Sequence, residues 1–247
     1  MLPQATLSRV HQSWLAHHER RMLVWLAARL PAWITPDHLT LLGIAGALLC
    51  GLSFAACLLW PPLLWVACAG LVLNWFGDSL DGSLARFRHI ERPRYGFFID
   101  HSADVVSQLL IFLGLGLSPY MRFDMACLAL LSYWLAALYT FIRAVATRVF
   151  QISYLGIGPT EIRLGLLAYT LGLILFHPFT VATPIGRLSL IDGFVLVTFC
   201  VVFVLFLMAV WSEGQRLGKL EPGALKPDAL KPGAARTAAS VERKASR

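Results

Sequence analysis

Four aspartates stand out because they fall in or at the ends of two long apolar segments, in a sequence that has only 14 acidic residues. They are Asp78, Asp81, Asp100 and Asp104. The first two are three residues apart and the last two are four apart, so on helices each pair shares one face. An acid in the middle of a membrane span costs about 2.5–3.5 kcal/mol on insertion scales, so four acids need compensation. The pattern indicates a polar site inside an apolar region.

A metal site is the chemistry that these acids favour. Two antiparallel helices joined by a short loop would bring both pairs together. Four carboxylates would then form a hard-oxygen site for Mg²⁺, Mn²⁺ or Ca²⁺, with enough charge for two divalent ions. Alternatively, the acids could form surface salt bridges with the arginines of the intervening loop, which are Arg86, Arg88, Arg92 and Arg94. Four acids on shared faces favour the metal site.

The residues that follow the first acid pair suit a phosphorylated ligand. Gly82 and Ala85 lie on the helix face of this pair, where small side chains leave room for a bulky ligand and permit close helix approach. Arg86 can grip a phosphate with its planar guanidinium. A metal cluster beside small residues and an arginine indicates a site for a nucleotide diphosphate.

The elements that must position this site are membrane helices. Hydrophobic residues make up 57% of the chain, charged residues make up 14%, and the mean hydropathy is +0.67. An ordinary soluble domain has about 25% charged residues. The sequence predicts an all-α integral membrane protein with six transmembrane helices, each long enough to cross a bilayer. The six apolar stretches are Leu39–Trp60, Leu63–Leu84, Tyr95–Leu117, Met125–Val149, Ile162–Phe179 and Leu190–Trp211.

The basic residues predict the orientation of these spans. With a cytoplasmic N-terminus, every Lys and Arg except Arg122 and Arg187 falls on the cytoplasmic side, as the positive-inside rule requires. The C-terminus and the loop between the two acid-bearing spans are then cytoplasmic, so the acid site faces the cytoplasm. The net charge of +7 is therefore a topology signal with some attraction to anionic lipid, and no nucleic-acid partner is predicted.

Two flanking segments are predicted around the membrane domain. Residues 1–35 have apolar side chains at near-helical spacing, separated by histidines and arginines, which is typical of an amphipathic helix at the cytoplasmic membrane surface. Residues 36–212 form the six-helix transmembrane catalytic domain. Residues 213–247 are rich in Ala, Pro, Lys and Arg and have too little apolar surface to pack, so we expect a disordered basic tail.

The acid-bearing segment resembles the signature of the CDP-alcohol phosphotransferases. That signature reads Asp-x-x-Asp-Gly-x-x-Ala-Arg, eight or nine residues, then Gly-x-x-x-Asp-x-x-x-Asp. Every fixed position matches, with the last part beginning at Gly96. A second segment, Pro36-Asp37-His38-Leu39-Thr40 followed by Gly43, also matches. The resemblance covers residues 36 to about 211.

The resemblance implies a role for each matched residue. Asp78, Asp81 and Asp100 would be metal ligands, for Mg²⁺ or Mn²⁺. Asp104 would complete the metal site and act as general base on the acceptor hydroxyl. The CMP half of a CDP-linked donor would be contacted by Gly82, Ala85 and Arg86, with Asp37, Thr40 and Gly96. The family also implies a homodimer in contact with membrane lipids.

The general base stays open between two residues. A base cannot be a tightly bound metal ligand and freely accept a proton, so either Asp104 keeps one oxygen free or His101 takes the proton. A histidine has a suitable unperturbed pKa. The alternative role of His101 is packing or hydrogen bonding.

The substrates also stay open between the two reactions of the family. One transfers phosphocholine or phosphoethanolamine from a CDP-alcohol to diacylglycerol, and the other joins CDP-diacylglycerol to inositol phosphate, glycerol phosphate or serine. The pair Asp100-His101 and the stretch Gly158-Pro159-Thr160-Glu161 resemble the choline/ethanolamine branch, and Glu161 would suit a cationic or neutral group. Arg143 and Arg163 could instead bind an acceptor phosphate.

Two hypotheses of other classes compete with the enzyme. Intramembrane acids also mark ion pathways, so a divalent-cation transporter is the main alternative. Arg86 beside the acids and the lack of a convincing internal repeat argue against it. A non-catalytic lipid-binding protein derived from the family is the third possibility, and the presence of all four acids argues against it.

Overall fold

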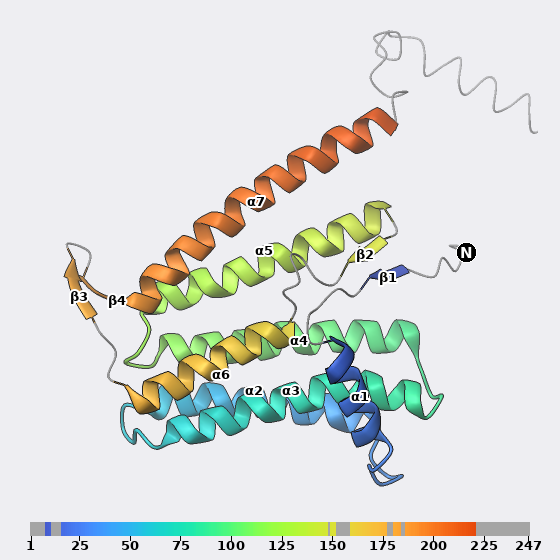
Figure 1. The fold of residues 1–247 in the computed structure, drawn as a ribbon, viewed down its shortest axis with the longest axis horizontal. Helices are drawn as coiled ribbons and strands as arrows, with labels where there is room; N and C mark the ends of the chain where they lie inside the picture. The colour runs from blue at the N-terminus through green and yellow to red at the C-terminus, as the bar shows by residue number, and fades with distance from the viewer. Residues whose placement is uncertain are drawn as a thin grey trace, which may run out of the picture. The chain divides into compact units, whose positions relative to one another are not determined.

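The computed structural model describes residues 8–10, 16–147, 149–151, 159–176, 180–183 and 186–220, and the described chain is built almost entirely from helices (Figure 1). The helices are α1 (Ala16–Ala27), α2 (Pro36–Ala56), α3 (Leu63–Phe87), α4 (Pro93–Gly116), α5 (Phe123–Thr147), α6 (Pro159–Leu175) and α7 (Leu190–Leu220). The chain divides into two compact units, Met1–Phe203 and Val204–Arg247. The first unit contains every residue of the predicted site.

Membrane-spanning helices dominate the described residues, as the sequence predicts. Five helices are long and apolar enough to cross a bilayer, namely α2, α3, α4, α5 and α7. The remaining predicted span coincides with α6, an apolar helix of 17 residues. The protein is therefore an all-α integral membrane protein whose helices fall where the six apolar stretches lie.

Three details differ from the predicted elements. Four short strands were not predicted: β1 (Ser8–Val10) pairs in parallel with β2 (Val149–Gln151), and β3 (Thr180–Thr183) pairs antiparallel with β4 (Gly186–Ser189). Within the described residues of the segment 1–35, the N-terminal helix spans Ala16–Ala27. Helix α7 continues beyond the predicted span to Leu220, and the rest of the predicted tail lies outside the described residues. Strands this short have no apolar alternation that the sequence could reveal.

Glycines bring α2 very close to α3 and α4. A Cβ atom built on Gly70 would lie 2.7 Å from the backbone oxygen of Gly46 and 2.7 Å from the backbone nitrogen of Cys50. One on Gly43 would lie 3.3 Å from the backbone nitrogen of Asp78. Gly51 and Gly114 make the corresponding approach between α2 and α4. Small residues allow membrane helices to pack backbone against backbone, so this seam sets the spacing of the three helices.

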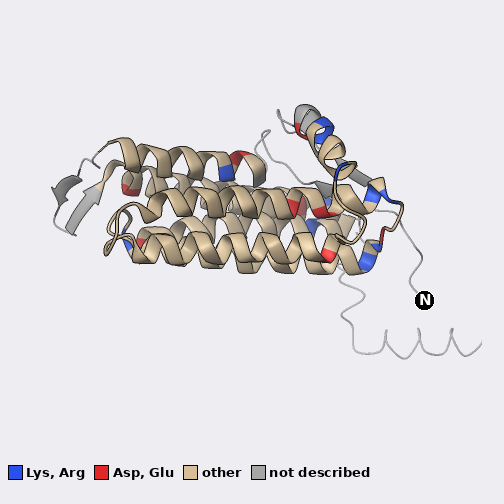
Figure 2. Cartoon of the chain, turned by 90° about the horizontal axis from the view of Figure 1, so that it is seen from below, with Lys and Arg blue, Asp and Glu red and all other residues tan. Residues whose placement is uncertain are grey.

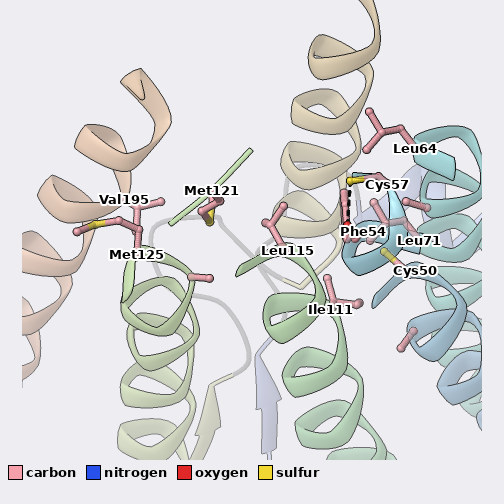
Figure 3. Close-up of a cluster of buried hydrophobic side chains, with 13 residues drawn as sticks. Cys50, Phe54, Cys57, Leu64, Leu71, Ile111, Leu115, Met121, Met125 and Val195 are labelled. Atoms are coloured by element: carbon pink, nitrogen blue, oxygen red, sulfur yellow. Dashed lines mark hydrogen bonds between the residues drawn. The ribbon is translucent and has the colours of Figure 1, made fainter. Parts of the chain in front are cut away.

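The apolar core, whose side chains Figure 3 draws, is built mainly from residues at the helix ends remote from the α3–α4 loop. Phe54 and Cys50 of α2, Leu71 of α3 and Leu115 of α4 are almost fully buried there. The Cys57 thiol, at the end of α2, donates to the carbonyl oxygen of Phe54 at 2.9 Å, shown by the dashed line in Figure 3. This core fixes one end of the helices, while polar contacts fix the other end.

The polar end is organised by three helix termini. Thr35 caps α2 with a reciprocal hydrogen-bond pair to His38. Helix α3 stops because His89 adopts a left-handed conformation at φ 57°, and Ile90 N–H donates to the Ala85 carbonyl at 3.0 Å. Arg88 then donates to four carbonyls between α1 and α2. They belong to Leu30, Pro31, Ala32 and Ile34.

The glycine seam yields the first prediction. Gly70→Ala places a methyl group against backbone atoms that cannot rotate away, so α2 and α3 must separate. Overpacking of this kind costs about 1–3 kcal/mol, and the midpoint of thermal unfolding in detergent should fall. Gly172→Ala on α6 is the matched control, because nothing lies within 4 Å of its added Cβ. An unchanged midpoint for Gly70→Ala would contradict the close packing.

Candidate active site

The four aspartates lie on the two helices that meet at the loop 88–92. Asp78 and Asp81 lie in the second half of α3, and Asp100 and Asp104 lie in the first half of α4. Charged residues gather mainly toward one end of the helices in Figure 2, with long uncharged stretches beyond them. Asp78 and Asp100 both lie close enough to act electrostatically on Asp81 and on Asp104. The structure therefore brings the two predicted pairs into one neighbourhood.

Asp81 is the most buried of the four acids, at 6% exposure. The Thr40 hydroxyl on α2 donates to its Oδ2 at 2.5 Å, and the backbone N–H of Gly82 donates to its Oδ1. Gly43 lies one turn after Thr40, so the glycine seam brings this hydroxyl within reach of α3. Thr40, which the family resemblance links to the nucleotide, therefore also orients a predicted metal ligand.

Arg163 of α6 bridges the two acid-bearing helices. Its Nη1 donates to Asp78 Oδ2 at 2.6 Å, and its Nη2 donates to Asp104 Oδ1 at 3.1 Å. The three side chains are largely buried, at 13%, 21% and 24% exposure. Charge-assisted hydrogen bonds of this kind are the strong ones in proteins. The guanidinium therefore supplies part of the compensation that buried acids require.

A small cavity adjoins Arg163. Its volume is about 30 Å³, enough for a single water molecule. It is lined by Asn74, Ser107, Gln108, Ile111, Phe112, Tyr133, Ile162 and Arg163. Asn74 donates to the Gly43 carbonyl at 3.0 Å, whereas its Oδ1 is buried and, among the described residues, accepts no hydrogen bond. A water molecule in this cavity would satisfy that oxygen.

Asp100 and His101 form the outer part of the site. The Nδ1 of His101 lies 3.2 Å from Asp100 Oδ2, and its ring packs 4.2 Å from Phe97 and 5.1 Å from Phe141, between ring centroids. These rings border a largely apolar cleft of about 400 Å³ between α4 and α5. His101 thus faces both an acid and an apolar surface.

The predicted nucleotide contacts lie around the same helix ends. Arg86 folds back along α3, with Nη2 donating to Ser83 Oγ at 3.2 Å, and its Nη1 would lie 3.2 Å from a Cβ built on Gly82. Ala85 is half-buried one turn after Asp81. Gly96, in the first turn of α4, faces open space. Asp37 accepts a 2.5 Å hydrogen bond from Arg92, which ties the start of α2 to the start of α4.

Two predicted acceptor residues lie on the neighbouring helices α5 and α6. Glu161 lies in the first turn of α6, and Arg143 lies near the end of α5. Sequence reasoning also missed Glu19 of α1, whose carboxylate accepts hydrogen bonds from α3 and α6. A lone acid in an amphipathic surface helix carries no pattern that would have identified it.

The acids offer the donor chemistry of a divalent-cation site, since carboxylate oxygens are the preferred ligands of Mg²⁺ and Mn²⁺. Within the described ranges, no three His, Cys, Asp or Glu side chains converge closely enough to hold a metal ion. Asp78 and Asp104 instead turn toward the Arg163 guanidinium, and Asp81 turns toward Thr40. The residues fit a metal by type and neighbourhood, and their side chains would have to turn to bind it.

Comparison with protein families decides what kind of protein carries this arrangement. Residues 33–211 match the family model described as CDP-alcohol phosphatidyltransferase. The chain belongs to the CDP-alcohol phosphatidyltransferase family. It is therefore a transferase of substituted phosphate groups in phospholipid biosynthesis, which uses a CDP-linked donor and an alcohol acceptor at a membrane.

The matched range clarifies which parts of the chain form the enzyme. It begins just before α2 and ends within α7, so all four acids, Thr40 and Arg163 lie inside it, whereas α1 lies outside. The transferase assignment replaces the cation transporter and the non-catalytic scaffold. Members of this family generally depend on a divalent cation, which agrees with the donor chemistry of the four acids.

Arg163 gives the second prediction. In Arg163→Gln, Asp78 and Asp104 lose their shared counter-charge, and breaking a buried pair from one side costs about 3–5 kcal/mol. The unfolding midpoint in detergent should fall without divalent cation, and Mg²⁺ should raise it more than in the wild type by supplying the missing charge.

The matched control for that prediction is Arg216→Gln. The Arg216 guanidinium is exposed and lies 3.5 Å from Glu213, and pairs with a solvent-exposed partner at this distance contribute only about 0–1 kcal/mol. Equal midpoints for Arg163→Gln and the wild type in the absence of Mg²⁺ would show that the bridge carries no stability.

Proposed function

We propose that this transferase moves a phosphocholine- or phosphoethanolamine-type group from a CDP-alcohol to the hydroxyl of diacylglycerol, with release of CMP and with Mg²⁺ or Mn²⁺. The observation that carries the reaction type is the neighbourhood of the four aspartates with Thr40 and Arg163, inside the matched family range. Phosphoryl-type transfer relies mainly on positioning and charge stabilisation, which these residues can provide.

In this proposal, Asp78, Asp81, Asp100 and Asp104 would hold the divalent cations, and four carboxylates carry enough charge for two of them. The cations would neutralise the diphosphate and stabilise the leaving phosphate. Thr40 holds the Asp81 carboxylate in one orientation. Gly82 leaves space beside Arg86, so the guanidinium can turn from Ser83 to a phosphate oxygen. The CMP half would lie along these residues, with Ala85, Gly96, Asp37 and Thr40 around it.

We assign the general base to Asp104. Its carboxylate lies beside Arg163 and Asp78, deep enough to be shielded from bulk water, and one oxygen accepts from Arg163. His101 contacts Asp100 and two phenylalanine rings, which suits a packing and orienting role at the cleft. A proton from the acceptor hydroxyl would pass to the Asp104 oxygen that binds no metal.

The choice of a lipid acceptor is supported by the surroundings of His101. The cleft beside it is lined by Phe97, Phe98, His101, Ser102, Val105 and Phe141, which is an apolar surface suited to an acyl chain. Glu161, at the start of α6, would favour a cationic or neutral head group over a phosphate. A lipid hydroxyl in the cleft would approach the acids from the α4 side.

A second candidate is favoured by Arg163. A guanidinium inside the acid site could bind the phosphate of a small acceptor such as inositol phosphate or glycerol phosphate, with CDP-diacylglycerol as the donor and Arg143 assisting. In that reaction the apolar cleft would hold the acyl chains of the donor. The two candidates therefore differ in which substrate carries the lipid.

The positive-inside rule supports cytoplasmic termini and a cytoplasmic active site, because the loop 88–92 between the acid-bearing helices contains arginines. The family resemblance supports a homodimer. Labelling of single cysteines introduced at Glu91 and at Tyr120, in a variant without the five native cysteines, would test the orientation in sealed vesicles, since the two positions lie at opposite ends of α4.

CMP release by the purified protein in lipid micelles with Mg²⁺ or Mn²⁺ tests the proposed reaction. CDP-choline or CDP-ethanolamine with diacylglycerol should release CMP, and EDTA should stop the release. Release only from CDP-diacylglycerol with inositol phosphate, glycerol phosphate or serine would select the second candidate. No release from any pair by folded protein would contradict both.

Asp104→Asn gives the third prediction. The amide cannot accept the acceptor proton, so CMP release should fall at least about a hundredfold, the usual contribution of a general base. Metal binding, measured with Mn²⁺ by electron paramagnetic resonance, should persist through the other three aspartates. The control is Asp124→Asn, because Asp124 pairs with Arg122 at the start of α5, remote from the site. Full turnover in Asp104→Asn would rule out its role as base.

A further inference from the structure

Glu19 of α1 connects two helices of the active site through one carboxylate oxygen. Its Oε1 accepts from Trp75 Nε1 at 3.1 Å and from Ser79 Oγ at 3.4 Å, both on α3. The same oxygen accepts from Thr160 Oγ1 at 3.0 Å, in the first turn of α6. Glu19 lies outside the range that matches the family, so neither the signature nor the family match gives it a role.

The three donors stand beside the residues that form the acid site. Ser79 is the chain neighbour of Asp78, and Thr160 precedes Arg163 by three residues, which is about one helical turn. Asp78 and Arg163 are themselves joined by the 2.6 Å ion pair. Glu19 therefore ties together the same two helices, one turn away from the contact that links them inside the site.

The hydrogen bonds of Glu19 are not what attaches α1 to the protein. Leu23 and Ala27 of α1 are buried in a cluster with Leu39, Leu80 and Leu84, and this apolar contact docks α1 on the ends of α2 and α3. In Figure 1, α1 lies across α3. Because apolar burial holds the helix, the carboxylate is available for the separate task of fixing the start of α6.

We propose that Glu19 is a positioning residue, which sets the distance between the cytoplasmic ends of α3 and α6 and so places Arg163 between Asp78 and Asp104. It touches none of the reacting groups and acts through Thr160 and Ser79. The N-terminal helix is then part of the frame of the active site. The effect on turnover rests on the proposed function, whereas the effect on α6 does not.

The test compares Glu19→Ala with Glu19→Gln in the full-length protein in lipid micelles. Glutamine keeps an acceptor oxygen at the same place, and alanine removes it. Deuterium exchange of the α6 amides 163–168, the first that bond within the helix, should be about tenfold faster in Glu19→Ala, because the lost hydrogen bonds hold the start of α6 against α3. Metal-dependent CMP release should fall about tenfold as well. Glu19→Gln should stay within about threefold of the wild type in both measurements.

Two further variants sharpen the result. Thr160→Val removes one donor and keeps the side-chain shape, so it should speed exchange in α6 while the exchange of α2 amides stays unchanged. Arg21→Gln changes a charge on the exposed side of α1 and should alter neither measurement. The proposal would be overturned if the α6 amides of Glu19→Ala exchanged at the wild-type rate. It would also be overturned if Glu19→Gln and Glu19→Ala lost the same amount of CMP release and of amide protection. If the wild-type protein itself released no CMP, the proposed function would be overturned. The exchange data would still decide the role of Glu19.

Discussion

The spacing between α2 and α3 is the constraint on which the site geometry depends. Side chains larger than hydrogen at Gly46 or Gly70 would push the two backbones apart. The same seam runs through Gly43 and Gly77 and ends beside Thr40, whose hydroxyl reaches Asp81. A helix separation wider by the size of one methyl group would break that contact, so the glycines act on the chemistry without touching any substrate.

Charge balance is the second condition, because the acids lie in an apolar protein at a membrane. Hydrogen bonds from Thr40 and Gly82 stabilise the Asp81 carboxylate, and Arg163 stabilises the other two inner acids. Asp100 is the most exposed of the four and lies beside His101. The site therefore passes from buried, paired acids at α3 and α6 to an exposed acid beside an apolar cleft.

The helices and the four acids could be predicted because long apolar stretches and a spaced motif are local signals. The positions of α2 to α5 and α7 follow from apolar length alone, and the signature brings Asp78 and Asp104 into one site. The partners of Arg163 could not be predicted, because Asp78 is 85 residues away in the chain, Asp104 is 59 residues away, and no sequence pattern links them to Arg163. The role of Glu19 could not be predicted either, because its hydrogen-bond donors are also far away in the chain. The short strands have too few residues for a periodic signal.

The bridge made by Arg163 has a consequence for how the chain assembles in the membrane. Synthesis delivers α3 and α4 first, with their acids, and the guanidinium follows only with α6. Until then, Asp78 and Asp104 face each other without their shared cation, and like charges resist close packing of the two helices. The close approach of these two acids therefore depends on a charge that a helix far along the chain supplies.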